Sequence, residues 1–234
     1  MPCATICETW YTFYLEKINP DNPDEYEFNG KWRKMKVRKE KIEIKGGKVV
    51  EKKIQFTHRG PVISDLKHLS GTSISMHWTG NEYSNESRTL YLLRKAENWD
   101  DFKNAVKTFK AVSQNIVYAD VKGNIGLYCS AGVPLREKGA GVSIMPGWTD
   151  KYDWKGFVPF EALPHSYNPE NGYLCSANNK TVDEDYPYYI STWFVPDHRF
   201  RRINEMLASQ KRFSVDDFKR MQGDWKSKLV EDMR

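Results

Sequence analysis

The sequence predicts an α+β fold, and three observations support this prediction. Two strand-like segments, 31–44 and 49–58, lie on either side of Gly46-Gly47, and adjacent glycines supply the positive φ angles of a tight hairpin turn. A strand, a turn and a second strand follow one another over 113–128. The third observation is a set of capped segments with helical periodicity. Hairpins and helices are therefore both expected.

The first element is a strand over 9–18, where bulky apolar and polar side chains alternate loosely before the turn residues of 19–24. The hairpin comes next. Its apolar residues fall on odd positions early in the first strand and on even positions later. This change of parity predicts a bulge or register change near 38–41.

The middle and the C-terminal end of the chain are predicted to be helical in part. A helix over 99–112 has Asn98 as its N-cap and apolar residues at helical spacing. A second helix covers 198–209. A third starts at the N-cap Ser214, with Asp217 at the third helical position, and runs to near the last residue.

The segment 133–171 is rich in Gly, Pro, Trp and Tyr and has little periodicity, which predicts an ordered irregular excursion. The sequence contains no internal repeat and no low-complexity linker. We therefore expect residues 1–234 to form a single structural unit.

The composition excludes several classes of protein. Hydrophobic residues make up 39% of the 234 residues and aromatic residues 14%, which favours a globular chain. No run approaches the roughly 18 apolar residues of a membrane span, and the N-terminal residues lack the pattern of a secretory signal. The net charge of +5 is too modest to indicate nucleic acid. We expect neither a membrane nor a nucleic acid as partner.

The four cysteines, Cys3, Cys7, Cys129 and Cys175, are scattered along the chain. The first two are four residues apart, unlike the CxxC of zinc and redox sites, and no His pair has metal-ligand spacing. Free thiols are the favoured interpretation, with a structural disulfide or metal ligation as the alternatives. We expect no metal site.

The hairpin is strongly basic, since residues 31–53 carry eleven Lys or Arg against three Glu. Its few aromatic residues, mainly Trp32, do not form a stripe on which bases could stack. The favoured interpretation is a solvated edge whose lysines oppose sheet association. Nucleic-acid binding is the alternative.

The motif SYNPENGYLCSANNK is followed by DEDYPYY and HRFRRI, and earlier segments include FTHRGPVISD, AENWDDF and SQNIVYADVKGNIGLY. In this order the motifs resemble those of the penicillin acylase family, from Tyr14 to Asp224. The resemblance implies an N-terminal nucleophile hydrolase, with part of an αββα sandwich built on antiparallel sheets. It also implies hydrolysis of a small-molecule linear amide through an acyl-enzyme.

The resemblance implies roles for four residues. Asn178 would donate a side-chain N–H to the oxyanion, and Arg199 would organise the site through bidentate hydrogen bonds. Trp78 and Gln114 fall where family members line the acyl pocket, although Gln114 is polar where penicillin G acylases have an apolar residue. Pattern alone allows plainer interpretations: a turn for Asn178, a solvated basic face for Arg199, and ordinary sheet positions for the other two.

Neighbouring polar residues are expected to be structural. Arg201 and Arg202 are predicted to form a solvated basic face. His58 is predicted to organise the turn before Gly60-Pro61, because the chain has no G-x-S-x-G motif and the family uses no His base.

The family nucleophile is a Ser, Cys or Thr whose own α-amine acts as base. Removal of Met1 would leave Cys3 internal, and Gly71-Thr72 lies in a stretch that family members keep intact. We therefore expect part of a large catalytic chain that lacks its nucleophile and is inactive alone. The small chain and the N-terminal part of the large chain would complete it, and exposed edges would favour homo-oligomers without them.

A non-catalytic binding or structural module derived from the same fold is the alternative function. Family members are usually exported, whereas the N-terminal residues of this sequence lack a secretory signal. The location of this chain is therefore not predicted.

No cofactor is expected. Family calcium sites use Asp side chains, and this chain has Thr12 at one such position and no Asp in the Tyr188–Ile190 stretch where another is expected. Carboxylates supply most of the attraction in a calcium site. The resemblance therefore does not extend to a bound calcium.

Overall fold

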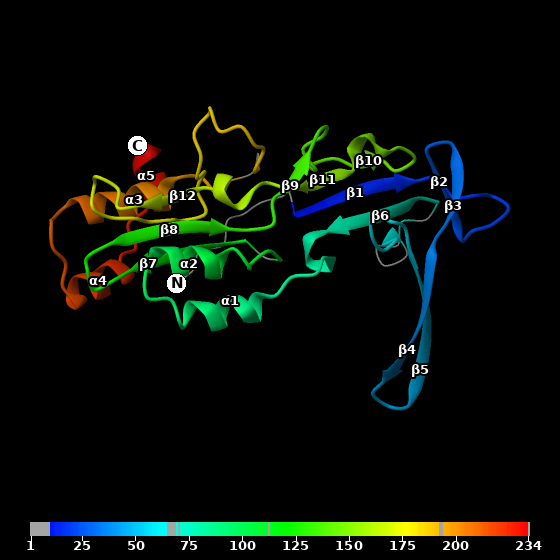
Figure 1. Ribbon diagram of the computed structural model, residues 1–234, viewed down its shortest axis with the longest axis horizontal. Helices are drawn as coiled ribbons and strands as arrows, with labels where there is room; N and C mark the ends of the chain where they lie inside the picture. The colour runs from blue at the N-terminus through cyan, green and yellow to red at the C-terminus, as the bar shows by residue number, and fades with distance from the viewer. Residues whose placement is uncertain (1–9, 65–68, 70, 112, 192–193, 234) are drawn as a thin grey trace. The chain divides into compact units, whose positions relative to one another are not determined.

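The computed structural model describes residues 10–64, 69, 71–111, 113–191 and 194–233 (Figure 1). The chain divides into two compact units: the described residues of unit 1 lie within Ser84–Gly132 and Pro159–Arg234, and those of unit 2 within Glu8–Tyr83 and Val133–Val158. The predicted α+β class is confirmed, because antiparallel sheets occur in both units and α-helices in unit 1. No helix among the described residues is long and apolar enough to cross a bilayer.

Unit 1 is built on an antiparallel sheet in the order β12 (His165–Tyr167), β8 (Ile125–Ser130) and β7 (Gln114–Ala119). The strand pair predicted over 113–128 is thus confirmed. Helix α2 (Trp99–Val106) is anchored on this sheet by Trp99, whose ring lies 4.7 Å from that of Tyr167, centroid to centroid. Gly126 makes room for it, since a Cβ there would lie 2.3 Å from the Trp99 ring.

Helix α2 is shorter than the predicted 99–112. Its N-cap is as predicted, with the Asn98 side chain accepting from Asp101 N. At the other end the Ser130 hydroxyl donates to the carbonyl of Val106, and Gly132 N donates to Lys110 O at 2.9 Å. A donor from β8 therefore satisfies the last carbonyl of the helix, and the chain turns away earlier than its periodicity indicates.

The remaining helices of unit 1 are α1 (Glu86–Leu93), α3 (His198–Ala208), α4 (Val215–Gln222) and α5 (Lys228–Asp232). Helix α3 and the capping box of Ser214 and Asp217 on α4 were predicted correctly. The single long C-terminal helix was wrong, because the chain leaves the helix at Gly223 and forms α5 after a break. Helix α1 was not predicted.

Unit 2 is mostly strand. Its main sheet has the order β10 (Met145–Pro146), β1 (Tyr11–Glu16) and β6 (Ser73–Trp78), and β9 (Pro134–Arg136) pairs with β11 (Trp154–Phe157). The strand predicted over 9–18 is confirmed as β1. The segment 133–171 is more regular than expected, since it contains four short strands, β9 to β12.

The basic hairpin region contains two hairpins where one was predicted. Strands β2 (Glu25–Phe28) and β3 (Lys31–Lys34) form the first, and β4 (Lys36–Ile44) and β5 (Lys48–Phe56) form the second. Met35 separates them: it is 3% exposed, and its N–H donates to Asp24 O at 2.8 Å.

The bulge predicted near 38–41 was wrong. The β4–β5 register runs without interruption from Lys36↔Phe56 to Ile44↔Lys48. Nearly every side chain of β4 is exposed, on both faces of the strand. Because neither face must enter a core, apolar residues can change parity without a change of register.

A buried charge network lies in the core of unit 2. The Arg59 side chain is 1% exposed, and its Nε donates to Asp153 Oδ1 at 2.5 Å while Nη1 lies 3.5 Å from Glu16 Oε1. Two backbone carbonyls, of Gly147 and Thr149, accept from its terminal nitrogens at 2.8 Å. Three elements distant in sequence therefore converge on one guanidinium.

The two carboxylates respond to this network differently. Burial raises the pKa of Glu16, against the hydrogen bond from Ser75 and the attraction of Arg59. Burial also acts to raise the pKa of Asp153, but hydrogen bonds from His58 and Arg59 outweigh it and lower that pKa. Gly147 packs against the carboxylate of Glu16, since a Cβ there would lie 2.4 Å from Oε2.

Candidate functional site

The Asn178 side chain lies at a sharp backbone turn in unit 1. Asn178 has φ +62°, a left-handed conformation that Asn tolerates better than most residues. Its carbonyl accepts from Val195 N at 3.1 Å. The predicted turn is therefore present, and it presents an amide side chain at its corner.

Arg199, in the first turn of α3, fixes the orientation of this amide. Its Nη2 donates to Asn178 Oδ1 at 2.6 Å and to Ala177 O at 2.9 Å. A guanidinium has only donors, so the amide atom that faces it is the oxygen. The Nδ2 group, the donor end of the amide, consequently points away from Arg199. One nitrogen makes both bonds, so the bidentate geometry predicted for Arg199 is not what the structure shows.

Two Asn side chains that were not predicted hold the backbone around this turn through hydrogen bonds. Asn179 is 9% exposed; its Oδ1 accepts from Ala177 N at 3.0 Å, and its Nδ2 donates to Lys180 O at 2.8 Å. Asn115 of β7 donates to Ser176 Oγ at 2.6 Å. Asn115 is 1% exposed although Val117, on the same face of β7, is 55% exposed, so the alternation of the strand carried no signal that could have identified it.

The two proposed pocket residues lie in different units. Gln114 begins β7, opposite Ser130, and directly precedes the buried Asn115 that ties the strand to Ser176. Trp78 ends β6 in unit 2, is 38% exposed, and lies against Gly80, where a Cβ would meet the ring at 2.4 Å. Gln114 thus lies in the unit that holds the Asn178 turn, and Trp78 lies in the other unit.

The predicted solvated face holds for Arg201, whose side chain is 40% exposed, but Arg202 is only 20% exposed and both side chains are paired with acidic groups. Arg202 pairs with Asp224 through Nε at 2.9 Å and Nη2 at 2.7 Å, and this contact lowers the pKa of Asp224. Arg201 donates to Asp197 and Asp232. Asp197, Asp224 and Asp232 neutralise the two side chains, and the last two lie after the helix, where helical periodicity does not reveal them.

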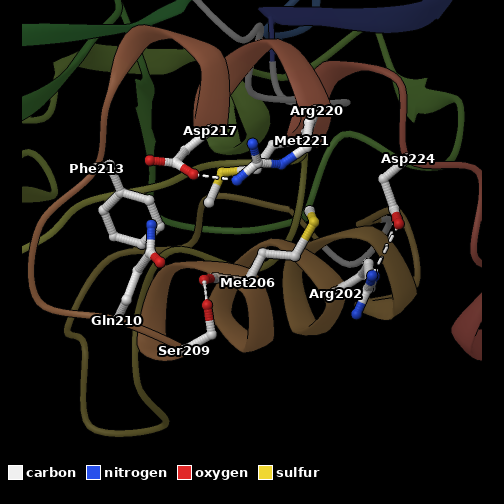
Figure 2. Close-up of a pocket in the computed structure, with 9 residues that line it drawn as sticks. All are labelled: Arg202, Met206, Ser209, Gln210, Phe213, Asp217, Arg220, Met221 and Asp224. Atoms are coloured by element: carbon white, nitrogen blue, oxygen red, sulfur yellow. Dashed lines mark hydrogen bonds and ion pairs between the residues drawn. The ribbon is translucent and has the colours of Figure 1, made fainter.

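The Arg202–Asp224 pair borders a polar pocket of about 240 Å³ between α3 and α4 (Figure 2). Figure 2 also shows Asp217 of α4 facing Arg220, and the Ser209 hydroxyl donating to Met206 O at the end of α3. These charged groups are paired with one another, and the Arg202–Asp224 pair links α3 to the residue that follows the C-cap of α4.

A much larger apolar cavity, about 1590 Å³, lies in unit 1 between β7, β8, α3 and α4. Its walls include Val117, Ile125, Ile203, Phe213 and Phe218. Ligand pockets for small molecules measure roughly 300–1,000 Å³. The cavity is thus larger than a small-molecule site and resembles an unfilled core.

His58 lies in the turn before Gly60, but the hydrogen bonds that close this turn come from Thr57, whose N–H donates to Gly60 O at 2.9 Å. The Nδ1 of His58 lies 2.8 Å from Tyr26 Oη and its Nε2 lies 3.3 Å from Asp153 Oδ2. The second contact connects His58 to the network around Arg59 through Asp153.

The hydroxyl of Thr12, the residue at one family calcium position, accepts two hydrogen bonds. Its hydroxyl oxygen accepts from Trp154 Nε1 at 2.9 Å and from Arg136 Nη2 at 3.0 Å. A guanidinium beside this oxygen repels a divalent cation. In the part of the chain that the structure describes, no three His, Cys, Asp or Glu side chains are grouped to hold a metal.

Cys129 and Cys175 are free thiols, as predicted, and burial raises the pKa of Cys175. Cys3 and Cys7 lie outside the described residues. The expectation that Cys3 is not a nucleophile therefore concerns a residue outside the described part of the chain.

Comparison with known proteins shows which family has these features. The model of the penicillin amidase family matches residues 5–234. The chain is 31% identical over 209 residues to penicillin acylase 2 proenzyme of Pseudomonas sp. (strain SE83), covering 88% of this chain and 27% of that protein. It is 32% identical over 208 residues to penicillin G acylase of Escherichia coli, covering 87% and 24%.

Two further matches extend this result. Acyl-homoserine lactone acylase QuiP of Pseudomonas fluorescens (strain Pf0-1) is 27% identical over 205 residues, covering 86% of this chain and 25% of that protein. A solved structure of thermostable penicillin G acylase from Alcaligenes faecalis aligns with a TM-score of 0.75 and 30% identity, over 92% of this chain and 39% of that one. The chain thus spans about a quarter of the length of the curated relatives it matches.

Proposed function

The chain belongs to the penicillin amidase family and has the N-terminal nucleophile hydrolase fold, and on this premise we propose that it stabilises the oxyanion in a linear-amide hydrolase. The nucleophile would come from another part of the complete enzyme. The chain alone would therefore not turn over substrate.

One observation carries this proposal: Arg199 Nη2 donates to Asn178 Oδ1 at 2.6 Å. This bond commits the amide oxygen to a cation and leaves Nδ2 as the donor group of the side chain. Because Arg199 fixes the amide before the reaction, the donor need not reorient when negative charge develops on the substrate oxygen. Such preorganised donors are the basis of oxyanion stabilisation. The cationic partner also polarises the amide and strengthens Nδ2 as a donor.

The reaction would follow from this geometry. The free α-amine of the nucleophile removes its proton, and the nucleophile attacks the amide carbonyl. Asn178 Nδ2 donates to the resulting oxyanion. The C–N bond then breaks, the amine leaves with the proton, and water releases the acid from the acyl-enzyme.

The apolar cavity of unit 1 supports the expectation of a polypeptide partner. Its volume of about 1590 Å³ and its aromatic and aliphatic walls are typical of a core that more chain would fill. We propose that the small chain and the N-terminal part of the large chain complete the enzyme, and that Gln114 and Trp78 line its acyl pocket.

We also propose that the complete enzyme works without calcium at Thr12. Added calcium should leave the melting temperature of the chain unchanged, because Arg136 already contributes a positive charge beside the Thr12 hydroxyl. Thermal unfolding followed by circular dichroism, with calcium chloride or with EDTA, measures this. A rise in melting temperature that saturates with calcium would contradict it.

The test of the proposed function is an activity assay on two proteins: the 234-residue chain and a precursor that includes it. Both are given phenylacetyl and long-chain acyl amides, and release of the amine is measured. We expect turnover by the precursor alone. Turnover by the chain alone would refute the proposal that the nucleophile lies elsewhere.

A folded but inactive precursor would point instead to a non-catalytic module. Its gene sequence gives an independent check, because an active enzyme requires a Gly followed by Ser, Cys or Thr at the start of a strand.

A further inference from the structure

The positive charge of this chain is concentrated in one hairpin. The β4–β5 hairpin, residues 36–56, carries eight Lys or Arg and three Glu, which is a net charge of +5. The whole chain has 36 basic and 31 acidic residues, also a net +5. The other residues therefore sum to zero, and the hairpin holds the entire excess.

The hairpin stands apart from the other sheets of unit 2. Its strands form a two-stranded sheet of their own, and Figure 1 shows them as a long arm. A two-stranded hairpin exposed on both faces gains little from burial. Burial in the core of the unit therefore does not explain why the chain forms so long a hairpin.

The charges on the arm are mostly uncompensated. Arg38, Lys41 and Lys53 have acidic partners, whereas Lys36, Lys39, Lys45, Lys48 and Lys52 form no ion pair with the described residues. Lys39 faces Lys53 directly across the two strands. Like charges opposite one another destabilise a strand pair, and an external polyanion would relieve that repulsion.

The tip of the arm is apolar on one face. Ile42 and Ile44 are 50% and 46% exposed and lie on the same face, two residues apart. Val50 faces Ile42 across the strands, and Lys48 and Lys52 flank Val50 on that face. An exposed aliphatic patch between lysines is complementary to a surface in which anionic groups cover a hydrocarbon layer.

We propose, in contrast to the expectation from composition that no membrane is a partner, that the β4–β5 hairpin docks the protein on an anionic lipid bilayer. The aliphatic residues of the tip would enter the boundary between headgroups and acyl chains, and the flanking lysines would meet lipid phosphates. This role is independent of the amidase activity, since no hairpin residue belongs to the Asn178 site. Nucleic acid is disfavoured because the arm has no aromatic residues near its tip on which bases could stack.

The experiment measures co-sedimentation of the 234-residue chain with two kinds of vesicle. One is phosphatidylcholine alone, and the other is an equimolar mixture of phosphatidylcholine and phosphatidylglycerol. We expect binding to the mixed vesicles only, weakened by added salt because the attraction is electrostatic.

Two variants separate the charges from the apolar tip. Replacing Lys45, Lys48 and Lys52 together by Gln should weaken binding by roughly a hundredfold, since each lysine near an anionic surface contributes a factor of about five. It should also flatten the dependence on salt. Replacing Ile42 and Ile44 by Thr keeps β-branched residues in the strand; it should weaken binding by about tenfold and leave the salt dependence unchanged.

The matched control replaces three exposed lysines elsewhere, Lys122, Lys138 and Lys211, by Gln, which removes the same charge. It should bind like the wild type, and circular dichroism should show that every variant folds. Equal binding to both vesicles, no binding, or an equal loss in the control would overturn the proposal. So would binding of DNA or heparin as tight as that of mixed vesicles and unaffected by the Thr substitutions, which would indicate a general polyanion surface.

Discussion

Replacing Asn178 by Ala in the complete enzyme should lower kcat by about 10²–10³-fold, the usual effect of removing one oxyanion donor. The loss should fall mainly on kcat, because the donor acts on charge that exists only in the transition state. Steady-state kinetics on an amide substrate measures both parameters. A loss confined to KM would show that Asn178 binds the ground state instead.

Ala changes the backbone as well as the amide, because φ is +62° at this position. Asn178→Gly removes only the amide and should be as inactive as Ala. Asn178→Asp keeps the size and the tolerance for this conformation, but it presents only acceptors and should also be inactive. The matched control is Asn29→Gly, since Asn29 has φ +49° in a hairpin turn of unit 2; its activity should be close to wild type.

Arg199 gives a graded test of the same site. Both of its hydrogen bonds come from Nη2, so one Lys ammonium could replace them in part. Arg199→Lys should retain some activity and Arg199→Met almost none. Equal activity of these two variants would show that Arg199 does not orient the amide.

Replacing Arg59 by Leu should lower the free energy of unfolding of unit 2 by about 3–5 kcal/mol at neutral pH, because it leaves the buried carboxylate of Glu16 and the partly buried carboxylate of Asp153 without their cation. The guanidinium is 1% exposed and contacts both Glu16 and Asp153. Urea denaturation followed by tryptophan fluorescence reports on unit 2 through Trp148 and Trp154. The matched control is Arg38→Leu, which removes a 59% exposed Arg from a surface ion pair and should unfold like the wild type.

The pH dependence checks the cause. In the wild type the pKa of Asp153 is lowered, so its contribution to stability is present above its unfolded pKa and is lost as the pH falls through its folded pKa. In the Arg59→Leu variant burial acts without the cation and raises both carboxyl pKa values above their unfolded values, so stability is lost as the pH rises. The difference between the two proteins should therefore shrink in acid. A difference that is constant with pH would mean that Arg59 acts only by filling space.

The sequence predicted elements best where local chemistry decides them. Asn98 and Ser214 cap helices as expected, because the side chain and the backbone donor it satisfies are neighbours in the chain. Prediction from the sequence failed where tertiary contacts determine where an element ends. One example is the end of α2, where Ser130 of β8 supplies a donor to the carbonyl of Val106. The predicted bulge failed because parity is informative only for a strand with one buried face, and β4 is exposed on both.

The candidate site was predictable by resemblance and not by pattern. Nothing in the sequence of an Asn-Asn pair distinguishes Asn178, with its side chain held by Arg199, from Asn179, which bonds to its own backbone neighbours. The network of Glu16, Arg59 and Asp153 was missed for a related reason. Its members are far apart in sequence, and each taken alone is an ordinary charged residue.

The charge distribution of the β4–β5 hairpin also has a consequence for handling the protein. Because residues 36–56 hold a charge equal to the net charge of the whole chain, a cation-exchange resin or an acidic carrier bead would capture the molecule by this arm. Immobilised molecules would then share one orientation. Neutralising the arm's lysines would abolish both the retention and the alignment.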